Sequence, residues 1–349
     1  ADHYGNPSSD HVLGQRAKAA VEAARAEVAA LIGAMPGEIV FTGCATEANN
    51  LALLGAARAS GRKALVTSAI EHPSVLQPLR HLARQGWALT ELPVDAAGRV
   101  QVDHAANAIT PEVALVSVML ANNETGSLQA VRALADLAHA AGALMHVDAA
   151  QAVGKVAVDV NELGADLLTL AGHKFYAPKG VGALVVRTSV SIEPIQFGAG
   201  HERGLRPGTE NVPHIVALGE AARLARTTLA QEATRMAALR DRLHGLLAAA
   251  IPGLQLNGHP TERLPNTLNV SFPAVAGWQV LAAAPTVAAS TGSACHAGDH
   301  AVSGVLAAMG LTREAAAGAV RLSLGRFTTG NEIDAAAAAL SGAWKSLTA

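Results

Sequence analysis

Short β-rich runs alternate with alanine-rich helical segments through the first two-thirds of this chain. The runs are EIVFT at 38–42, ALVTS at 64–68, ALTELPV at 88–94, ALVSVML at 114–120, ALMHVD at 143–148, DLLTL at 166–170 and GALVVR at 182–187. Strands joined by helical crossovers align in parallel and need helices against both faces. The pattern therefore predicts an α/β fold with a mostly parallel, seven-stranded sheet covered by helices.

A long helical tract from about residue 212 to 250 leads away from this region. Beyond it come NVSFPAV, another helical segment and RLSLGRF, which are typical of a smaller α+β domain. A chain of 349 residues also exceeds the size at which one core usually keeps growing. We therefore predict a large domain over 1–230 and a small C-terminal domain over 231–349.

The bulk properties limit the classes of partner. A net charge of −2 argues against electrostatic nucleic-acid binding, and no run reaches the roughly 18 apolar residues that a membrane span needs. The printed sequence opens without a leader pattern and has two cysteines, Cys44 and Cys295. We expect a soluble protein of the reducing cytoplasm, with both thiols free.

Lys174 and Asp148 are the most informative pair. Lys174 follows the apolar run DLLTL by a few residues, and Asp148 closes the run LMHVD. A lysine amine, whose ordinary pKa is near 10.4, is only about one part in a thousand free base at neutral pH, so its place beside a buried strand needs a reason. A Schiff base between Lys174 and pyridoxal phosphate (PLP) supplies one, while Asp148 could keep the pyridine nitrogen protonated and make the ring an electron sink.

Other polar residues also follow strands. His72, Asn123, Asp148 and the pair His173-Lys174 each come a few residues after an apolar run. Ligands of open α/β sheets bind at the carboxyl edge of the strands, so one crevice could hold them all.

FTGCATEANN at 41–50 places Gly43, Ala45 and Thr46 between a strand and a helix. Backbone N–H groups and a hydroxyl at a helix N-terminus can hold a phosphate dianion. Taken alone, the turn is more readily explained as a capped helix start. The presence of Lys174 and Asp148 at the same sheet edge favours the phosphate.

Three further residues have both a functional and an ordinary interpretation. His72 could stack on a cofactor ring and relay protons, or be a loop residue with satisfied hydrogen bonds. Asn123 and Gln151 offer amide donors for the ring oxygen of the cofactor, although NNETG is also a good turn and cap.

The segment 198–211, GAGHERGLRPGTEN, combines glycines with His201, Arg203, Arg206 and Thr209. Such a loop suits an anion contact or a subunit junction, and a plain surface loop is the alternative.

Cysteine and arginine positions complete the set. Small residues flank Cys295, which is typical of an accessible thiol that can visit a substrate, whereas Cys44 lies inside a strand-to-helix turn and is expected to be structural. Arg321 on a candidate strand either pairs with a structural carboxylate or binds the carboxylate of an amino-acid substrate.

Several signatures are missing from the sequence. There is no G-x-x-x-x-G-K-[ST], no H-E-x-x-H and no G-x-S-x-G. Nucleotide-, zinc- and serine-based chemistry are disfavoured, and no metal site is predicted.

The motifs taken together resemble the class V aminotransferase branch of the fold-type I PLP enzymes, and within it the cysteine desulfurases and selenocysteine lyases. They occur in the family's order over nearly the whole chain: GNPSS, CATEANN, EHPSV, MLANNETG, HVDAAQAVGK, GHKFYAPKGVGAL, HERGLRPGTEN, LPNTLNVSF, TGSACHAG and RLSLGRFTT.

The resemblance implies roles for residues in the cofactor site. Lys174 would bear the internal aldimine, Asp148 would pair with the pyridine nitrogen, and His72 would stack on the ring. Asn123 and Gln151 would contact the ring oxygen.

The resemblance also implies how phosphate, substrate and sulfur are bound. Ala45, Thr46 and His173 would bind the phosphate, and Thr209 would reach the phosphate of the neighbouring subunit, which implies a homodimer. Arg321, together with Asn123, would hold the substrate, and Cys295 would take sulfur as a persulfide. A sulfur-acceptor or iron–sulfur scaffold protein would be the partner.

Some positions depart from the family pattern. The family's N-terminal segment, with its Asp-x-x-Ala-Thr strand motif, does not occur in the printed sequence, which opens at the later Gly-Asn-Pro. Ala171 replaces a serine that many desulfurases use on the phosphate, and Cys44 replaces a glycine, so a lower cofactor affinity is expected. ANNETG and RPGTEN look like selenocysteine lyases, but Pro73 stands where animal lyases have aspartate.

The first functional hypothesis is therefore a PLP-dependent cysteine desulfurase or selenocysteine lyase that forms alanine. Transamination of a small amino acid shares every cofactor residue but leaves Cys295 without a role. A non-catalytic scaffold for sulfur-acceptor proteins is the third alternative.

Overall fold

The computed structural model describes residues 4–292 and 303–349. Within them the chain forms two compact units, the first comprising the chain up to Leu92, Val102–Leu120 and Ala130–Leu229. The second comprises Pro93–Gln101, Ala121–Gln129 and the chain from Ala230 onward. The two short segments were assigned to the large domain from sequence, but their hydrogen bonds run to later residues, as from the Asn269 side chain to the carbonyl of Glu124.

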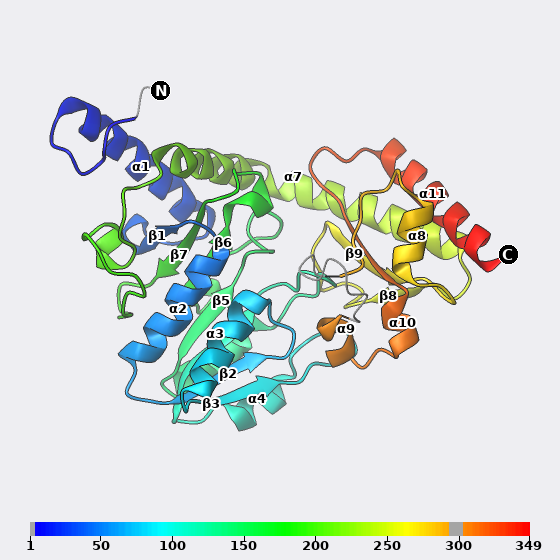
Figure 1. The fold of residues 1–349 in the computed structure, drawn as a ribbon, viewed down its shortest axis with the longest axis horizontal. Coiled ribbons are helices and arrows are strands. Elements are labelled where there is room, and N and C mark those ends of the chain that lie inside the picture. Colours follow the sequence, from blue (N-terminus) through cyan, green and yellow to red (C-terminus); the bar gives the residue numbers. More distant parts are fainter. Residues whose placement is uncertain (1–3, 293–302) are drawn as a thin grey trace. The chain divides into compact units, whose positions relative to one another are not determined.

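The first unit is built on a seven-stranded sheet in the order β1-β7-β6-β5-β4-β2-β3 (Figure 1). The strands are β1 (Ile39–Thr42), β2 (Ala64–Ser68), β3 (Ala88–Leu92), β4 (Val113–Met119), β5 (Leu144–Asp148), β6 (Leu167–Ala171) and β7 (Gly182–Val186). Strands β3, β2, β4, β5 and β6 are parallel, whereas β7 is antiparallel to both β6 and β1. The predicted mostly parallel sheet of seven strands is confirmed.

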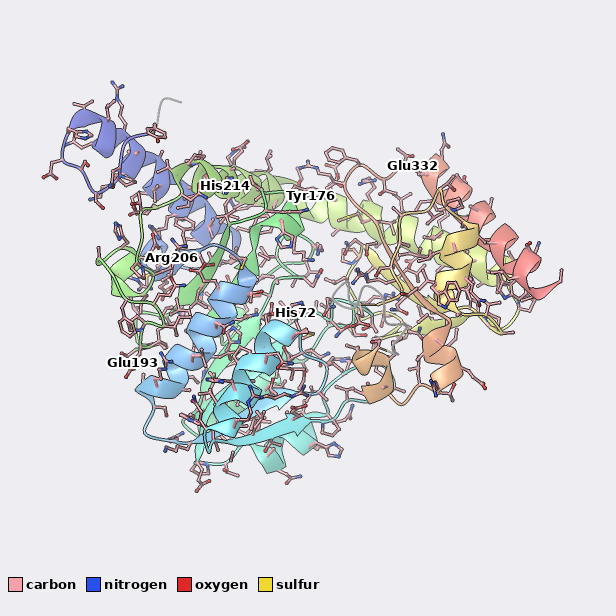
Figure 2. The ribbon with its side chains drawn as sticks, viewed as in Figure 1. His72, Tyr176, Glu193, Arg206, His214 and Glu332 are labelled. Carbon is pink, nitrogen blue, oxygen red and sulfur yellow. The ribbon has the colours of Figure 1, made fainter. Side chains whose placement is uncertain are left out.

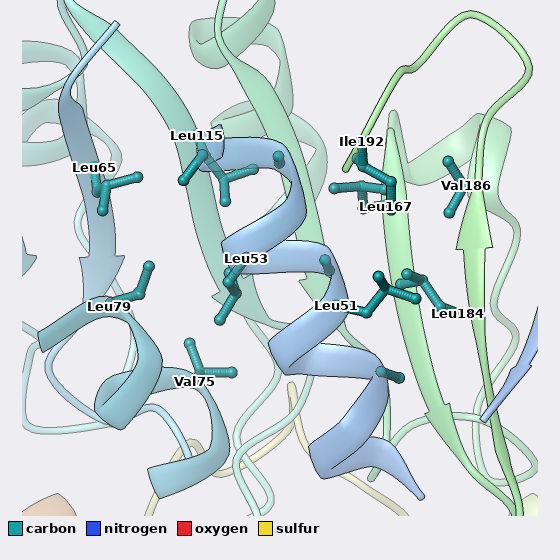
Figure 3. Packing of buried hydrophobic residues seen from close by; sticks show 14 of the residues in the cluster. Leu51, Leu53, Leu65, Val75, Leu79, Leu115, Leu167, Leu184, Val186 and Ile192 are labelled. Carbon is teal, nitrogen blue, oxygen red and sulfur yellow. The ribbon is translucent and has the colours of Figure 1, made fainter. Parts of the chain in front are cut away.

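Helices cover this sheet and close its core. They are α1 (Val12–Leu31), α2 (Ala45–Ala59), α3 (Pro73–Arg84), α4 (Val102–Ala108), α5 (Val131–Ala140), α6 (Val160–Leu163) and the first part of α7 (Val212–Ala250), with 3-10 turns η1 (Pro36–Glu38), η2 (Gly172–Phe175) and η3 (Glu202–Gly204). Figure 3 shows Leu51 and Leu53 of α2 against Leu115, Leu167 and Leu184 of the strands, in a buried hydrophobic cluster. Each such leucine contributes roughly 1.5–3 kcal/mol of burial.

The second unit is an antiparallel sheet with helices packed on it. Its order is β10-β9-β8, and its elements are β8 (Gln255–Asn257), β9 (Thr267–Ser271), β10 (Ala319–Ser323), the later part of α7, α8 (Gly277–Ala283), α9 (Gly304–Ala308), α10 (Arg313–Ala317) and α11 (Gly330–Thr348). Val270, Phe272, Val320 and Leu340 belong to its own buried cluster. None of the described helices is both long and apolar enough to span a bilayer.

The sheet register of the first unit brings the strand ends together. Asp148, the last residue of β5, pairs with Met119 of β4 and with Thr169 of β6. Ser68 and Ala171 end β2 and β6. Because parallel strands point the same way, the residues that follow them share one carboxyl edge.

Candidate functional site

The start of α2 presents backbone N–H groups to an anion. Its N-cap, Cys44, is extended and caps no amide through its side chain, so the first-turn amides of Ala45 and Thr46 receive no cap from it. A Cβ at Gly182 would lie 3.0 Å from the Cys44 carbonyl carbon and 2.8 Å from the Leu170 oxygen, so only glycine lets β7 approach this turn. A helix start of this kind favours a phosphate.

Glu47 stabilises the same turn. Its carboxylate accepts a hydrogen bond from the Gly43 N–H at 2.6 Å and another from Arg206 Nε at 2.8 Å. Figure 2 labels Arg206, which comes from the loop that also carries the exposed Thr209. The Arg206 charge offsets that of Glu47, which would otherwise oppose an anion at the helix start.

Asp148 is a buried carboxylate, 6 % exposed, with a donor on each oxygen. Oδ1 accepts from the Ala150 N–H and Oδ2 from the Asn49 side-chain amide, both at 2.9 Å. A carboxylate oxygen has two lone pairs, so each can accept a further hydrogen bond from a ligand.

His72, labelled in Figure 2, is the N-cap of α3. Its Nδ1 accepts from the Ser74 N–H at 3.1 Å and lies 2.8 Å from the Ser74 hydroxyl. Burial lowers the pKa of His72, the nearby Asp148 charge opposes that change, and Lys174 adds to it. His72 is therefore neutral at pH 7 with its hydrogen on Nε2, and it lies within electrostatic range of both Asp148 and Lys174.

Lys174 lies in the 3-10 turn η2 that follows β6, and its side chain is exposed. The turn ends at Tyr176, which has a left-handed backbone (φ 75°). Burial lowers the pKa of the neighbouring His173, and the charges of Lys174 and two other lysines lower it further. Gln151 uses its side-chain oxygen for Lys155 Nζ at 3.0 Å, which leaves its amide NH2 as the donor to a ligand.

The structure thus brings His72, Asp148 and Lys174 together at the carboxyl edge of the first unit. Ala45, Thr46, Gln151, His173 and Thr209 also belong to this unit, whereas Asn123 and Arg321 belong to the second. Cys295 lies outside the described residues.

In the second unit, Arg321 on β10 donates from Nη1 to the Asn123 carbonyl at 2.9 Å. Its Nε is buried and has no hydrogen-bond partner in the described part of the chain. Burial lowers the pKa of Arg321, and the negative charge of Glu124 opposes this change. A buried guanidinium N–H without an acceptor is suited to a carboxylate ligand.

Glu124 has a structural role in the second unit. Its Oε2 accepts from the Ser303 hydroxyl at 2.5 Å, and Ser303 in turn caps the Val305 and Leu306 amides of α9. A Cβ on Gly292 would lie 3.8 Å from the same oxygen. The Glu124 carboxylate thus holds the serine that caps α9.

Three other residues were missed although they stand inside the motifs. Asn49 of CATEANN donates to both Asp148 and Ser74, and Ser74 of EHPSV contacts His72. Glu71 precedes His72 and is buried. Burial raises its pKa to about 8 and the Asp148 charge adds to that effect, whereas the hydrogen bonds that Glu71 accepts from Ser68 and the Met119 N–H oppose it. The sequence signal that could have indicated these three residues was their place in the same motifs as predicted site residues.

Comparison with known proteins gives a consistent result. The family model for aminotransferase class-V matches residues 1–336. "Cysteine desulfurase 2" of Trichormus variabilis is 45 % identical over 95 % of this chain and 84 % of its own length, and "Cysteine desulfurase NifS" of Azotobacter vinelandii is 44 % identical over the same shares. A solved "NIFS-LIKE PROTEIN" has a TM-score of 0.91 and 35 % identity, covering 99 % of this chain and 92 % of its own. The chain therefore belongs to the aminotransferase class-V family.

Proposed function

We propose that this protein is a PLP-dependent cysteine desulfurase that takes sulfur from L-cysteine, or selenium from L-selenocysteine, and forms L-alanine. The observation that carries the proposal is the grouping of His72, Asp148 and Lys174 at one sheet edge, in a chain about 45 % identical to proteins named cysteine desulfurases. Enzymes of the class V aminotransferase family depend on PLP, so the cofactor is expected here.

The residues of the first unit fit this cofactor. The α2 start offers amides that Cys44 does not cap, Asp148 is an almost fully buried acceptor, and Lys174 provides an exposed primary amine. These three groups match a phosphate, a protonated ring nitrogen and an aldehyde. Ala171 is buried at the end of β6 and supplies no hydroxyl, which supports the expected lower phosphate affinity.

Bound PLP supplies an electron sink for the bonds of the substrate α-carbon. Lys174 would hold the cofactor through its Nζ in the resting enzyme, and the same amine would be the base for the substrate α-proton. Asp148 would keep the ring nitrogen protonated. His72, with hydrogen on Nε2, would act as a proton donor and as a stacking partner.

Substrate binding and sulfur transfer would use three further residues. The unpartnered Nε of Arg321 would pair with the substrate carboxylate, and Asn123 would contact both substrate and cofactor. Cys295 would attack the substrate sulfur, so that an S–S bond forms while the carbon–sulfur electron pair stays with the carbon skeleton. A thiol with a pKa near 8.5 is only a few per cent ionised at pH 7, so a stored persulfide helps sulfur release more than selenium release.

We also propose that the enzyme is a homodimer in which Thr209 reaches the partner's phosphate site. Thr209 is exposed, and several large apolar side chains of the first unit are exposed as well. They include Tyr4 at 94 % and Phe197 at 85 %. A sulfur-acceptor or iron–sulfur scaffold protein would receive the persulfide sulfur.

The test supplies L-cysteine and L-selenocysteine in parallel and measures alanine, sulfide and selenide. Lys174→Ala should abolish alanine formation from both, and borohydride should fix PLP covalently to residue 174 of the wild type. Cys295→Ala should lose activity with cysteine more than with selenocysteine. Full activity of Cys295→Ala with a 2-oxo acid acceptor would instead favour transamination, and a protein without PLP absorbance would contradict the enzyme proposal.

A further inference from the structure

The side-chain amide of Asn49 links two residues of the site that are far apart in sequence. Asn49 lies on α2, is wholly buried, and its Nδ2 donates to Asp148 Oδ2 and to Ser74 Oγ, both at 2.9 Å. With both hydrogens used, the orientation of the amide is fixed, because the opposite orientation would place its oxygen against a carboxylate.

The Ser74 hydroxyl extends the contact from Asn49 to His72. Ser74 Oγ, which accepts a hydrogen from Asn49, lies 2.8 Å from His72 Nδ1. Because Nδ1 accepts from the Ser74 backbone N–H and so carries no hydrogen, the Ser74 hydroxyl is the donor in this contact. His72 is therefore held with its hydrogen on Nε2 by two donors on Nδ1.

We propose that Asn49 is a positioning residue whose single amide group holds the Asp148 carboxylate and, through Ser74, the His72 imidazole in one fixed arrangement. The consequence at the cofactor rests on the proposed function, whereas the coupling to His72 does not. Asp148 and Lys174 are the charged groups that act on His72, and Glu71 is the other carboxyl group near Asp148.

Two variants separate the two contacts of Asn49. Asn49→Ala removes both, and Ser74→Ala removes only the one that leads to His72. Asn50→Ala is the matched control, because the next amide on the same helix donates to the Thr46 carbonyl instead. Ser74→Thr keeps the hydroxyl and should restore wild-type behaviour.

The first measurement follows His72 by nitrogen NMR in the full chain labelled at histidine, with the signal assigned from His72→Gln. Loss of a neutral hydrogen bond to Nδ1 should raise the pH at which His72 titrates by about half to one unit in Ser74→Ala. Ser74→Thr and Asn50→Ala should not change it. An unshifted His72 in Ser74→Ala would overturn the proposal.

The second measurement is PLP dissociation, followed by absorbance. Asn49→Ala should bind PLP about tenfold more weakly, because a hydrogen bond to a charged group is lost, while Ser74→Ala should stay within about twofold of wild type. Equal affinity in Asn49→Ala and wild type would overturn the proposal. If Asn49→Ala fails to fold, the comparison of Ser74→Ala with Ser74→Thr tests the proposal. A wild type that binds no PLP would refute the proposed function, while the NMR measurement would still test the link to His72.

Discussion

His146 makes a specific prediction about acid stability. It is wholly buried on β5, two residues before Asp148, with Nδ1 2.8 Å from the Ser117 hydroxyl and Nε2 3.1 Å from the Thr169 hydroxyl. Burial lowers its pKa from 6.5 to about 3. The folded protein therefore keeps His146 neutral at a pH where the unfolded chain takes up a proton.

The sign and size of the effect follow from proton linkage. Between pH 6.5 and about 3 the unfolded state binds one more proton than the folded state, so the free energy of unfolding falls as the pH is lowered. Each pH unit costs about 1.4 kcal/mol, which gives ~2 kcal/mol at pH 5 and ~5 kcal/mol once pH 3 is reached. Above pH 6.5 the contribution does not change with pH.

The assay compares urea unfolding of wild type and His146→Gln from pH 7.5 to 4.5, followed by circular dichroism. The difference in unfolding free energy between the two proteins should change by about 1.4 kcal/mol per pH unit below pH 6.5 and stay constant above it. Other titrating groups cancel in this difference because both proteins contain them.

Thr169→Val is the control, since it removes one hydrogen-bond partner of His146 but keeps the titrating ring. It should be less stable at every pH, with the pH dependence of the wild type. A pH-independent difference between His146→Gln and wild type would refute the reasoning, because the imidazole would then be protonated equally in both states.

Three further predictions follow from the site. Burial raises the pKa of Glu71 from 4.5 to about 8, so its stabilising contribution is complete below pH 4.5 and is lost as the pH rises to 8. In urea unfolding, Glu71→Gln should remove this loss, which is about 1.4 kcal/mol per pH unit, and an unchanged pH dependence of the unfolding free energy would contradict the prediction. Ser303→Ala should lose the hydrogen bond to Glu124 and the cap of α9, which should destabilise that helix by about 1–2 kcal/mol. The backbone amides of Val305 and Leu306 should then exchange hydrogen faster than in the wild type, whereas Ser303→Thr should keep their protection. Asp148→Ala should lower alanine formation on the order of a hundredfold or more with Lys174 still attached to PLP in a borohydride trap, and unchanged turnover would contradict the assigned role.

Much of the first unit could be predicted from local pattern. All seven predicted β-rich runs correspond to strands within two residues, because apolar stretches between helical segments are a local property of the chain. The pattern could not show that β7 runs antiparallel to its two neighbours, β1 and β6, because a fully buried apolar run has the same pattern in either direction. It also missed β8, which has only three residues.

The candidate site divides in the same way. Residue types and motif positions were enough to select Lys174, Asp148 and His72, because each lies at or just after the end of a strand at the ligand-binding edge. The hydrogen bonds between distant residues could not be read from the sequence: Asn49 reaches Asp148 across 99 positions, and Ser303 reaches Glu124 across 179. Such contacts form only where the folded chain brings two distant segments side by side. The sequence by itself therefore determined the strand–helix plan and the reactive groups, whereas the tertiary structure alone decided their hydrogen-bond partners and protonation, because those depend on burial and on neighbours that are distant along the chain.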